Sequence, residues 1–252
     1  MTAAVFIAAL DLPAGALLYR RVPKTLLVEH GAPTAADKRR INEGIEEVRW
    51  LAALKPTTIG VPAFRDAVRE YLEIAVMSAA LRDKAKAGRL VELIHRAIPY
   101  PVFLITAQGE SLALSLAHKR WSQGEAGATV LDGDLVMAEL AAGESNGFWQ
   151  IFRDSLALFR QPRIHLYALY QGWMDTLLAL LAARVTGTFA AAESPERAAA
   201  RQEALRECAR LDAEIVRLRA AAVKEKQIAR QVELNLELKR VEQQRAVVRQ
   251  RL

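Results

Sequence analysis

The strongest pattern of hydrophobic and polar positions lies between residues 69 and 123, and it predicts a β-hairpin. Val102–Ala107 is a short run rich in β-branched and aromatic residues, which is typical of a strand buried on both faces. Gln108–Glu110 follows as a turn that contains a glycine. Ser111–Arg120 then alternates with period two, so that leucines occupy one face and small residues the other.

A strand and a helix precede this hairpin. Glu70–Arg82 is apolar enough for a strand, and Gly88–Ala97 has apolar residues at helical spacing. Pro99 and Pro101 end the helix and force an extended link into the hairpin. Because the segment between the strands is long enough for a crossover connection, we expect a mixed sheet.

The same alternation places charged residues at the end of the hairpin's second strand. It puts His118 and Arg120 on the leucine face, and Lys119 and Trp121 on the small-residue face. A buried row that becomes cationic indicates a rim, and open sheets bind ligands at strand ends. One histidine and two cations suit phosphate or a partner's carboxylates, so these three polar residues are candidates for binding.

Two further strands and a helix are expected before this region. The strands are Thr25–Val28 and Thr57–Val61, and the helix is Ala35–Ala53, with Thr34 and Asp37 in a capping-box arrangement. The buried side of this helix is expected to be formed by Ile41, Ile45, Val48 and Leu51. The N-terminal segment up to Leu12 is expected to be a helix or an irregular arm, and the sheet should contain four or five strands.

After the hairpin the pattern changes from strand to helix. Ala128–Leu131 suits an edge strand, and Asp132–Asp134 suits a turn. One helix is expected from Asn146 to Pro162, and a second at Leu166–Thr186, which Gly187 ends. The first helix carries an aromatic stripe that we assign to the core: Trp149, Phe152, Leu156 and Phe159.

The tail has the spacing of a coiled coil, and it begins where Ser194 can cap a helix and Pro195 can occupy its first position. Its first seam consists of Ala204, Cys208, Leu211, Ile215, Leu218 and Ala222, with Leu205 beside it. That register continues through Glu225, Ala229, Val232, Leu236 and Lys239, whereas the stronger later set is Leu234, Leu238, Val241, Val248 and Leu252. An antiparallel hairpin that turns near Lys226–Arg230 explains the change of phase. A single helix with a local register shift is the alternative, because no Gly, Pro or Asn marks a turn.

These elements predict an α+β fold, in which a mixed sheet with flanking helices occupies residues 1–190 and a coiled-coil tail occupies residues 195–252. A hydrophobic content of 52% among 252 residues is sufficient for a core. A single cysteine, Cys208, excludes a disulfide within the chain, and no secretory signal is evident. Thr176–Ala183 is too short an apolar run to span a bilayer, so we expect a cytoplasmic protein without a membrane partner.

The net charge of +6 is concentrated in the tail, where 14 Arg and Lys residues from Glu196 onward face 9 Asp and Glu residues. Such a balance is typical either of a solvated helical face or of a nucleic-acid footprint. A second basic group, Arg20, Arg21 and Lys24, precedes the expected strand at Thr25. These cations either contact phosphate or only make the end of the strand more soluble.

The motifs of several enzyme classes are missing. The chain has no GxxxxGK[ST], GxGxxG, HExxH or GxSxG motif, and one cysteine with four histidines does not supply the usual zinc ligands. We therefore expect no cofactor and no metal. A divergent PD-(D/E)XK nuclease stays open through Asp66 and Glu73, but Ala75 occupies the lysine position, and Lys119 replaces it only from an adjacent strand.

Short segments throughout the chain carry a family resemblance. They are Arg21–Lys24, Trp50–Leu51, Leu54–Ile59, Ile94–Val102, Ala117–Arg120, Leu166–Trp173, Thr186–Gly187, Lys224–Gln227 and Val232–Asn235. Together they resemble a bacterial family known as domain of unknown function 4391. The chain departs from the family at Ile228–Ala229, where members have Phe-Asn, and this weakens the prediction of a turn there.

The resemblance implies partners rather than an activity, because the family has none assigned. Its members tend to be encoded beside helicases and DNA methyltransferases of restriction-like, anti-phage modules. The leading hypothesis is a non-enzymatic accessory subunit that docks such a helicase or methyltransferase through its tail. The alternatives are a DNA-binding module acting alone, the divergent nuclease, and, for the tail, pairing with a second copy as a homodimer.

Overall fold

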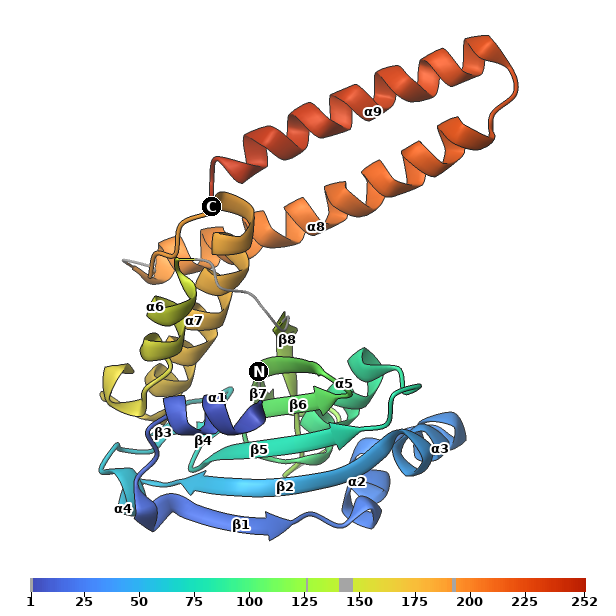
Figure 1. The fold of residues 1–252 in the computed structure, drawn as a ribbon. Coiled ribbons are helices and arrows are strands. Elements are labelled where there is room, and N and C mark those ends of the chain that lie inside the picture. The colour runs from blue at the N-terminus through green and yellow to red at the C-terminus, as the bar shows by residue number, and fades with distance from the viewer. Residues whose placement is uncertain (1, 126, 141–146, 192–193) are drawn as a thin grey trace. The chain divides into compact units, whose positions relative to one another are not determined.

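In the computed structural model, a six-stranded sheet forms the centre of the first of the chain's two units, Met1–Leu177 (Figure 1). The second unit is Leu178–Leu252, and the structure describes residues 2–125, 127–140, 147–191 and 194–252. The strands lie in the spatial order β1 (Leu17–Arg21), β2 (Ile45–Leu54), β5 (Ile74–Leu81), β6 (Val102–Gln108), β7 (Ser111–Trp121) and β8 (Thr129–Leu140).

The sheet is mixed, as the crossover predicted. β5 and β6 are parallel and are joined through α5 (Ala87–Ala97), whereas every other neighbouring pair in the sheet is antiparallel. A separate two-stranded ribbon consists of β3 (Phe64–Arg65) and β4 (Glu70–Tyr71). The predicted α+β class with flanking helices and a helical C-terminal region is confirmed.

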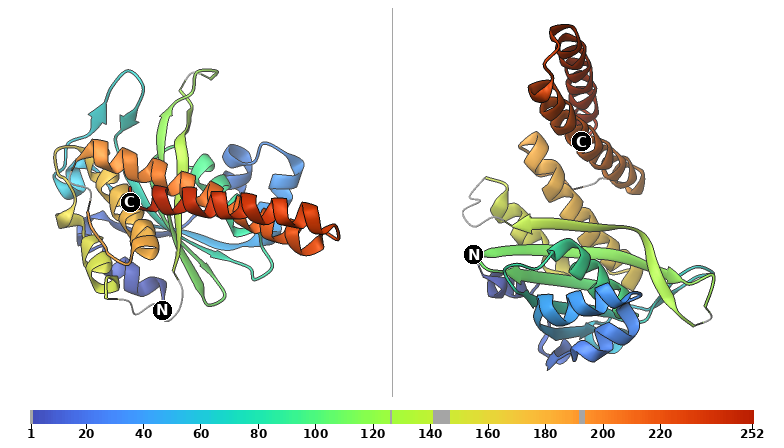
Figure 2. Two further views of the ribbon diagram at one scale, coloured as in Figure 1. Left: turned by 90° about the horizontal axis from the view of Figure 1, so that it is seen from above. Right: turned by 90° about the vertical axis from the view of Figure 1, so that its right-hand side faces the viewer.

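Helices cover both faces of this twisted sheet, whose strands fan apart in Figure 2. On one face, α2 (Lys24–Gly31), α3 (Ala35–Gly44) and α5 pack their apolar residues onto β2, β5 and β6. On the other face lie α1 (Ala3–Ala9), α6 (Trp149–Ser155) and the beginning of α7 (Leu166–Thr186). There the rings of Phe103 and Trp173 are 5.1 Å apart, so α7 is fixed to the middle of the sheet.

The expected helix Ala35–Ala53 is wrong in its second half, because the chain changes from α3 to β2 after Gly44. β2 contains two register shifts, between Ile45 and Glu47 and between Trp50 and Ala52. Each bulge adds one residue to the usual alternation of two. Buried residues therefore fall three apart, at Ile45, Val48 and Leu51, and this spacing imitates a helix.

Two expected strands are helices. Thr25–Val28 belongs to α2, where Leu27 is fully buried. Thr57–Val61 overlaps α4 (Pro56–Ile59), which has proline at its first position and ends at Gly60 with a φ of 65°. Both segments, of four and five residues, are too short for periodicity to distinguish strand from helix.

Strand boundaries differ from expectation at two other places. Glu70–Arg82 forms β4 and β5 with a break between them, and Leu72 in that break is 50% exposed. The expected edge strand Ala128–Leu131 is only the start of β8, because Asp132–Asp134 does not turn the chain: the strand continues, and its register shifts between Asp132 and Val136. Gly133 adopts a φ of 78° there, which glycine tolerates best.

The region after β8 follows the prediction in part. α7 has the expected bounds, and Gly187 ends it with a φ of 90°. α6 is short and is followed by a 3-10 turn, Leu158–Arg160, in which Phe159 is 63% exposed rather than part of the core. Asn146, the expected start of this helix, lies outside the described residues. A second 3-10 turn, Ala14–Ala16, precedes β1.

The second unit contains α8 (Pro195–Lys224) and α9 (Ile228–Arg249), which run side by side in opposite directions. Ser194 caps α8 by accepting a bond from the Arg197 N–H at 3.3 Å, as predicted. The α8 residues that face α9 are buried, namely Ala204, Cys208, Leu211, Ile215, Leu218 and Ala222, and Leu205 beside them is half-buried. On α9, Val241 and Val248 are buried, whereas Leu234 and Leu238 are half-buried, as is Leu252 just beyond the helix.

Ion pairs connect the two helices along their length. Arg219 on α8 bonds Glu242 on α9 at 2.7 Å, and Arg245 on α9 bonds Asp212 on α8 at 3.0 Å. These exposed pairs contribute little energy each, so the apolar residues between them supply most of the packing. Within the described residues, no helix is long and apolar enough to cross a bilayer.

β1 is an edge strand with an irregular backbone. Its register shifts between Leu17 and Arg20, and Tyr19 has a positive φ of 51°. The side chains of Leu18, Tyr19, Arg20 and Arg21 are all exposed.

Candidate functional site

The three residues expected at the rim, His118, Lys119 and Arg120, are consecutive on β7, so their side chains alternate between the two faces of the sheet. His118 lies on the face covered by α7, where its ring contacts those of Tyr167 and Tyr170. Lys119 lies on the opposite face and reaches toward α5. The predicted alternation is therefore confirmed, and it separates the side chains of His118 and Lys119.

His118 is held by a chain of hydrogen bonds. The Tyr71 hydroxyl lies 2.6 Å from its Nδ1, and its Nε2 lies 2.8 Å from Oε1 of Gln171. Gln171 in turn donates to Asp175 at 2.8 Å, and the Lys119 N–H donates to the Tyr71 oxygen at 3.3 Å. These bonds fit the neutral tautomer with its proton on Nε2.

Both ring nitrogens of His118 are thus engaged within the protein. Burial lowers the pKa of His118 to about 4, so the ring stays neutral at physiological pH. A neutral histidine with both nitrogens bonded supplies neither a charge for a phosphate nor a free base. In this arrangement His118 positions Tyr71 and α7 rather than a ligand.

A pair of arginines and one aspartate lie beside this network. Asp132, which pairs with His118 just before the register shift in β8, bonds Arg69 at 2.6 Å and lies 3.8 Å from the Nε of Arg120. The guanidinium of Arg69 also lies 5.5 Å from the centre of the Tyr167 ring. Two guanidinium groups therefore share one carboxylate beside the end of β7.

Lys119 is buried, with an exposed fraction of 1%. Its Nζ donates to the backbone carbonyls of His95 and Ile98, the second at 2.7 Å. These carbonyls lie at the C-terminal end of α5, where a helix leaves acceptors without partners and carries partial negative charge. Lys119 therefore caps α5 and takes no part in a basic surface.

Burial is reflected in the titration of Lys119 and its neighbour His95. Burial, followed by the charge of Arg96, lowers the pKa of Lys119 to about 7. Burial, followed by the charge of Lys119, lowers the pKa of His95 to about 3. His95 is bonded to Ser115 through its Nε2 at 2.9 Å, so it is a buried core histidine.

The other three predicted cations lie together at the opposite edge of the sheet. Arg20 and Arg21 project from β1, and Lys24 begins α2 and donates to the Asn42 carbonyl at 3.3 Å. The pKa of Lys24 is lowered first by burial and then by the charges of Arg82 and Arg21. Arg82 donates to the Glu43 carbonyl at 3.1 Å, next to the Asn42 carbonyl that Lys24 binds, so it belongs to the same group. We refer to Arg20, Arg21, Lys24 and Arg82 as the basic edge.

The residues considered for a nuclease do not form one site. Glu73 is buried and pairs with Lys55 at 3.0 Å, and Lys119 is engaged at α5. The Asp66 carboxylate accepts the N–H groups of Val68 and Arg69 in its own turn. Among the described residues, no three His, Cys, Asp or Glu side chains lie close enough together to hold a metal ion.

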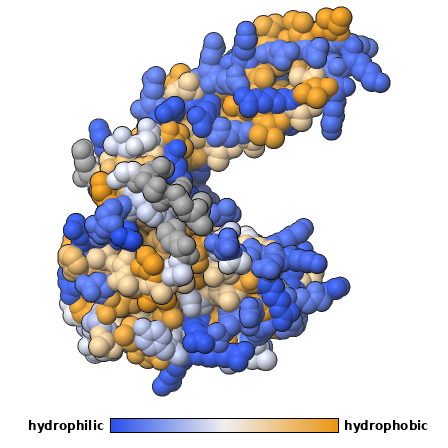
Figure 3. Space-filling model, viewed as in Figure 1, coloured by the Kyte–Doolittle hydropathy of each residue, from blue (hydrophilic) through white to orange (hydrophobic). Residues whose placement is uncertain are grey.

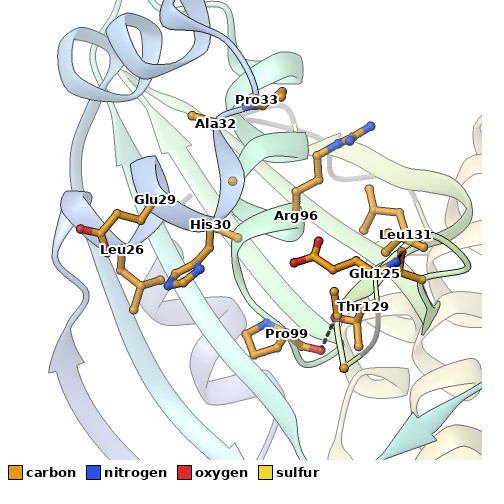
Figure 4. Close-up of a pocket in the computed structure, with 16 residues that line it drawn as sticks. Leu26, Glu29, His30, Ala32, Pro33, Arg96, Pro99, Glu125, Thr129 and Leu131 are labelled. Carbon is orange, nitrogen blue, oxygen red and sulfur yellow. Dashed lines mark hydrogen bonds between the residues drawn. The ribbon is translucent and has the colours of Figure 1, made fainter.

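A cavity of about 810 Å³ opens between α2, the end of α5 and the start of β8 (Figure 4). Its polar lining includes Glu29, His30, Arg96 and Glu125, and the Thr129 hydroxyl bonds the Pro99 carbonyl at 3.0 Å. No sequence pattern indicated this cavity, because its walls come from segments far apart in the chain. Its charged side chains are of both signs.

α8 carries a second apolar stripe that is exposed. Its members follow the same alternating spacing of four and three as the buried seam, and we refer to them as the outer stripe: Ala209, Ala213, Val216, Ala220 and Val223. Val216 is 66% exposed and Val223 is 84% exposed. Figure 3 shows apolar atoms between the charged side chains of the two helices. The sequence pattern predicted the buried seam but not the outer stripe, because three of its five residues are alanines, which are only weakly hydrophobic.

Comparison with known protein families gives a match over nearly the whole chain. A family model described as a domain of unknown function, DUF4391, matches residues 10–244. No curated protein and no solved structure matches the chain.

Proposed function

We propose, from the premise that this chain belongs to the DUF4391 family, that it is a non-enzymatic accessory subunit that docks a partner protein. In this proposal α8 and α9 form an antiparallel coiled-coil hairpin, and a helix of the partner packs along the outer stripe. The partner is a helicase or DNA methyltransferase of a bacterial DNA-modification or anti-phage module.

The observation that carries the proposal is the outer stripe on α8. The buried seam of α8 is the apolar surface that packs on α9, so the outer stripe is not needed for that packing. Its heptad spacing is suited to packing against another helix. Its three alanines allow close approach, and Val216 and Val223 supply side chains that lose water on docking. Arg210 and Arg217 flank the stripe and are held by Glu207 and Glu214 at 2.7 and 2.5 Å.

The test is recovery of the partner by the full chain at moderate salt. In a Val216→Glu, Val223→Glu variant we expect recovery of the helicase or methyltransferase to fall at least about tenfold. A factor of ten requires about 1.4 kcal/mol, and burying one valine contributes at least as much. Both valines are exposed, so the variant should keep the circular dichroism spectrum of the wild type.

The matched control is Val247→Glu on α9, which introduces the same charge at a valine that is 62% exposed and lies outside the outer stripe. Its recovery of partner should equal that of the wild type. Equal recovery by all three proteins would exclude docking through the outer stripe.

A DNA-binding module acting alone is the second candidate, and the basic edge favours it. The Arg21 side chain is 73% exposed, and its ion pair with Glu47 is long, at 3.8 Å. Phosphate binding by such residues releases counterions, so affinity falls steeply as salt rises.

The basic edge is tested by removing its charges. A variant with Arg20, Arg21 and Lys24 changed to alanine should bind duplex DNA more weakly. The slope of log affinity against log salt should decrease by about 0.9 for each phosphate that the variant no longer neutralises. The control changes Arg206, Arg210 and Arg217 to alanine, which removes the same charge from α8. Salt-independent binding, or none, in the wild type removes this candidate.

A further inference from the structure

α9 has two apolar stripes, and the structure buries one of them. Leu234, Leu238, Val241 and Val248 face α8. The other stripe consists of Ala229, Val232 and Leu236, which continue the register of the α8 seam and are exposed. Val232 is 51% exposed and Leu236 is 62% exposed, so packing on α8 does not account for them.

The junction between the helices does not impose a bend. It consists of Glu225, Lys226 and Gln227, three good helix formers. Glu225 has φ and ψ of −73° and 132°, and Gln227 has −87° and 118°, which are extended values that any residue adopts. The Glu225 carboxylate accepts the two N–H groups that follow it, at 2.8 and 2.9 Å. These exposed bonds are weak, so packing of α9 on α8 must hold the bend.

We propose that the chain also forms one helix through residues 225–227, and that two copies then pair antiparallel along the continuous stripe from Ala204 to Leu236. The second copy replaces α9 on the α8 seam, so α9 is a cover that competes with dimer formation. The proposal goes beyond the docking function, and the outer stripe stays exposed in both forms.

The spacing of the stripe fits such a pairing. The two apolar positions of each heptad are called a and d, and in an antiparallel coiled coil each a residue faces a d residue of the other helix. The steps of four and three give this pairing when the residue numbers of each facing pair add to 440, as 204 and 236 do. The facing residues are then Ala204 with Leu236, Cys208 with Val232, Leu211 with Ala229, Ile215 with Glu225, and Leu218 with Ala222. Small residues face large ones in three of these pairs, as close packing requires.

One pair opposes the association. Glu225 faces Ile215 of the second copy, and burying a carboxylate against an apolar side chain is unfavourable. This mismatch, and the exposure of Leu234, Leu238, Val241 and Val248 when α9 leaves α8, make the dimer weak and reversible, so the bent monomer should prevail at low concentration. Glu225→Leu should move the transition to a protein concentration at least about tenfold lower.

Sedimentation of the isolated full chain over a range of concentrations tests the stripe. We expect a shift from monomer to dimer in the wild type and loss of the dimer in Leu236→Glu and Val232→Glu. The control, Val247→Glu, lies on α9 outside this register and should dimerise like the wild type. Wild-type protein that stays monomeric at every concentration, or a control as impaired as Leu236→Glu, would overturn the proposal.

A second variant tests the continuous helix. Gln227→Pro suits the bent form, because the φ of −87° is close to the range of proline and only an exposed bond is removed. Proline at this position is incompatible with a helix that runs through the junction. The variant should be monomeric, and a dimer of wild-type strength would contradict the proposed geometry.

Cross-linking identifies the facing residues. Val232→Cys should form a disulfide with the native Cys208 of a second copy, giving a covalent dimer that Cys208→Ser abolishes. Within one continuous helix these positions are about 36 Å apart, at 1.5 Å per residue, so the bond must join two chains. The control is Val247→Cys, at an exposed valine of α9 outside this register, and it should give no covalent dimer with Cys208.

These measurements use the chain alone and leave Val216 and Val223 unchanged. A monomeric wild type therefore refutes the dimer without affecting partner docking. A failure of the outer-stripe variants to lose the partner likewise leaves the dimer untouched.

Discussion

At the scale of single residues, Lys119 shows how one contact changes the interpretation of a motif. In the sequence it stands between His118 and Arg120 as part of a basic group. In the structure its ammonium caps α5 from the interior of the sheet. Period-two alternation predicted the correct face, but nothing in the sequence showed that α5 would bring its last carbonyls within reach.

Lys119→Met is expected to destabilise the first unit by about 1–3 kcal/mol, because two buried carbonyls lose their donor. The pH dependence should also change. The pKa is about 7 in the folded chain, below the unfolded value of about 10.4, so between these values the unfolded state binds more protons. The contribution of Lys119 to stability therefore rises from pH 7 to about pH 10. Denaturation by urea at both pH values should show this rise in the wild type and a smaller one in the variant.

The rim beside His118 was predicted only in part. The charged end of β7 indicated it, and Arg120 does lie there. Arg69 and Asp132 were missed, because they are 63 positions apart in the sequence and lie on different elements. Sequence periodicity describes residues within one element, whereas such a contact depends on how two elements are aligned.

At the scale of elements, regular segments were predicted well and irregular ones were not. α5, α7 and the β6–β7 hairpin have uninterrupted periods and lie where expected. β2 was mistaken for helix because two bulges convert a spacing of two into a spacing of three. No particular residue type marks these bulges, so the hydrophobic pattern of this segment predicted a helix where the structure has a strand.

The contact of α2 with α5 provides a prediction about close packing. A Cβ added to Gly31 would lie 2.6 Å from the Leu93 carbonyl oxygen and 2.8 Å from the Ala97 Cβ. Gly31→Ala should therefore destabilise the fold by about 1–3 kcal/mol, as overpacked sites do.

Gly88→Ala on α5 is the matched control. Its Cβ would meet nothing within 4 Å, and alanine in a helix is favoured over glycine by up to about 1 kcal/mol. Urea denaturation followed by tryptophan fluorescence should give opposite signs for the two variants. A loss of stability in both would show that the Gly31 contact is not the cause.

At the scale of the whole molecule, the chain consists of two compact units, Met1–Leu177 and Leu178–Leu252. The predicted helical C-terminal region is confirmed, because helical periodicity is regular over the length of α8 and α9. The exposed second stripes on α8 and α9 were harder to recognise, since exposure depends on which stripe the fold covers. The docking proposal rests on the stripe of α8, and the dimer proposal rests on that of α9.

Leu211→Asp tests the separation of the units. Leu211 is 1% exposed in the α8 seam, and a carboxylate there is strongly destabilising. All four tryptophans, Trp50, Trp121, Trp149 and Trp173, lie in the first unit. On heating, the variant should lose helical circular dichroism early while tryptophan fluorescence keeps its wild-type midpoint. An equal shift of both signals would show that the units unfold together.

The irregular edge strand β1 has a consequence for storage and expression of the protein. A straight, apolar sheet edge is a template on which further chains polymerise into amyloid-like fibrils. β1 avoids this hazard in two ways. The positive φ of Tyr19 interrupts the row of backbone N–H and C=O groups that a further strand would bond, and Arg20 and Arg21 repel the same charges on an approaching copy. A substitution that straightened this strand and removed its charges would expose the whole sheet to fibril growth from that side.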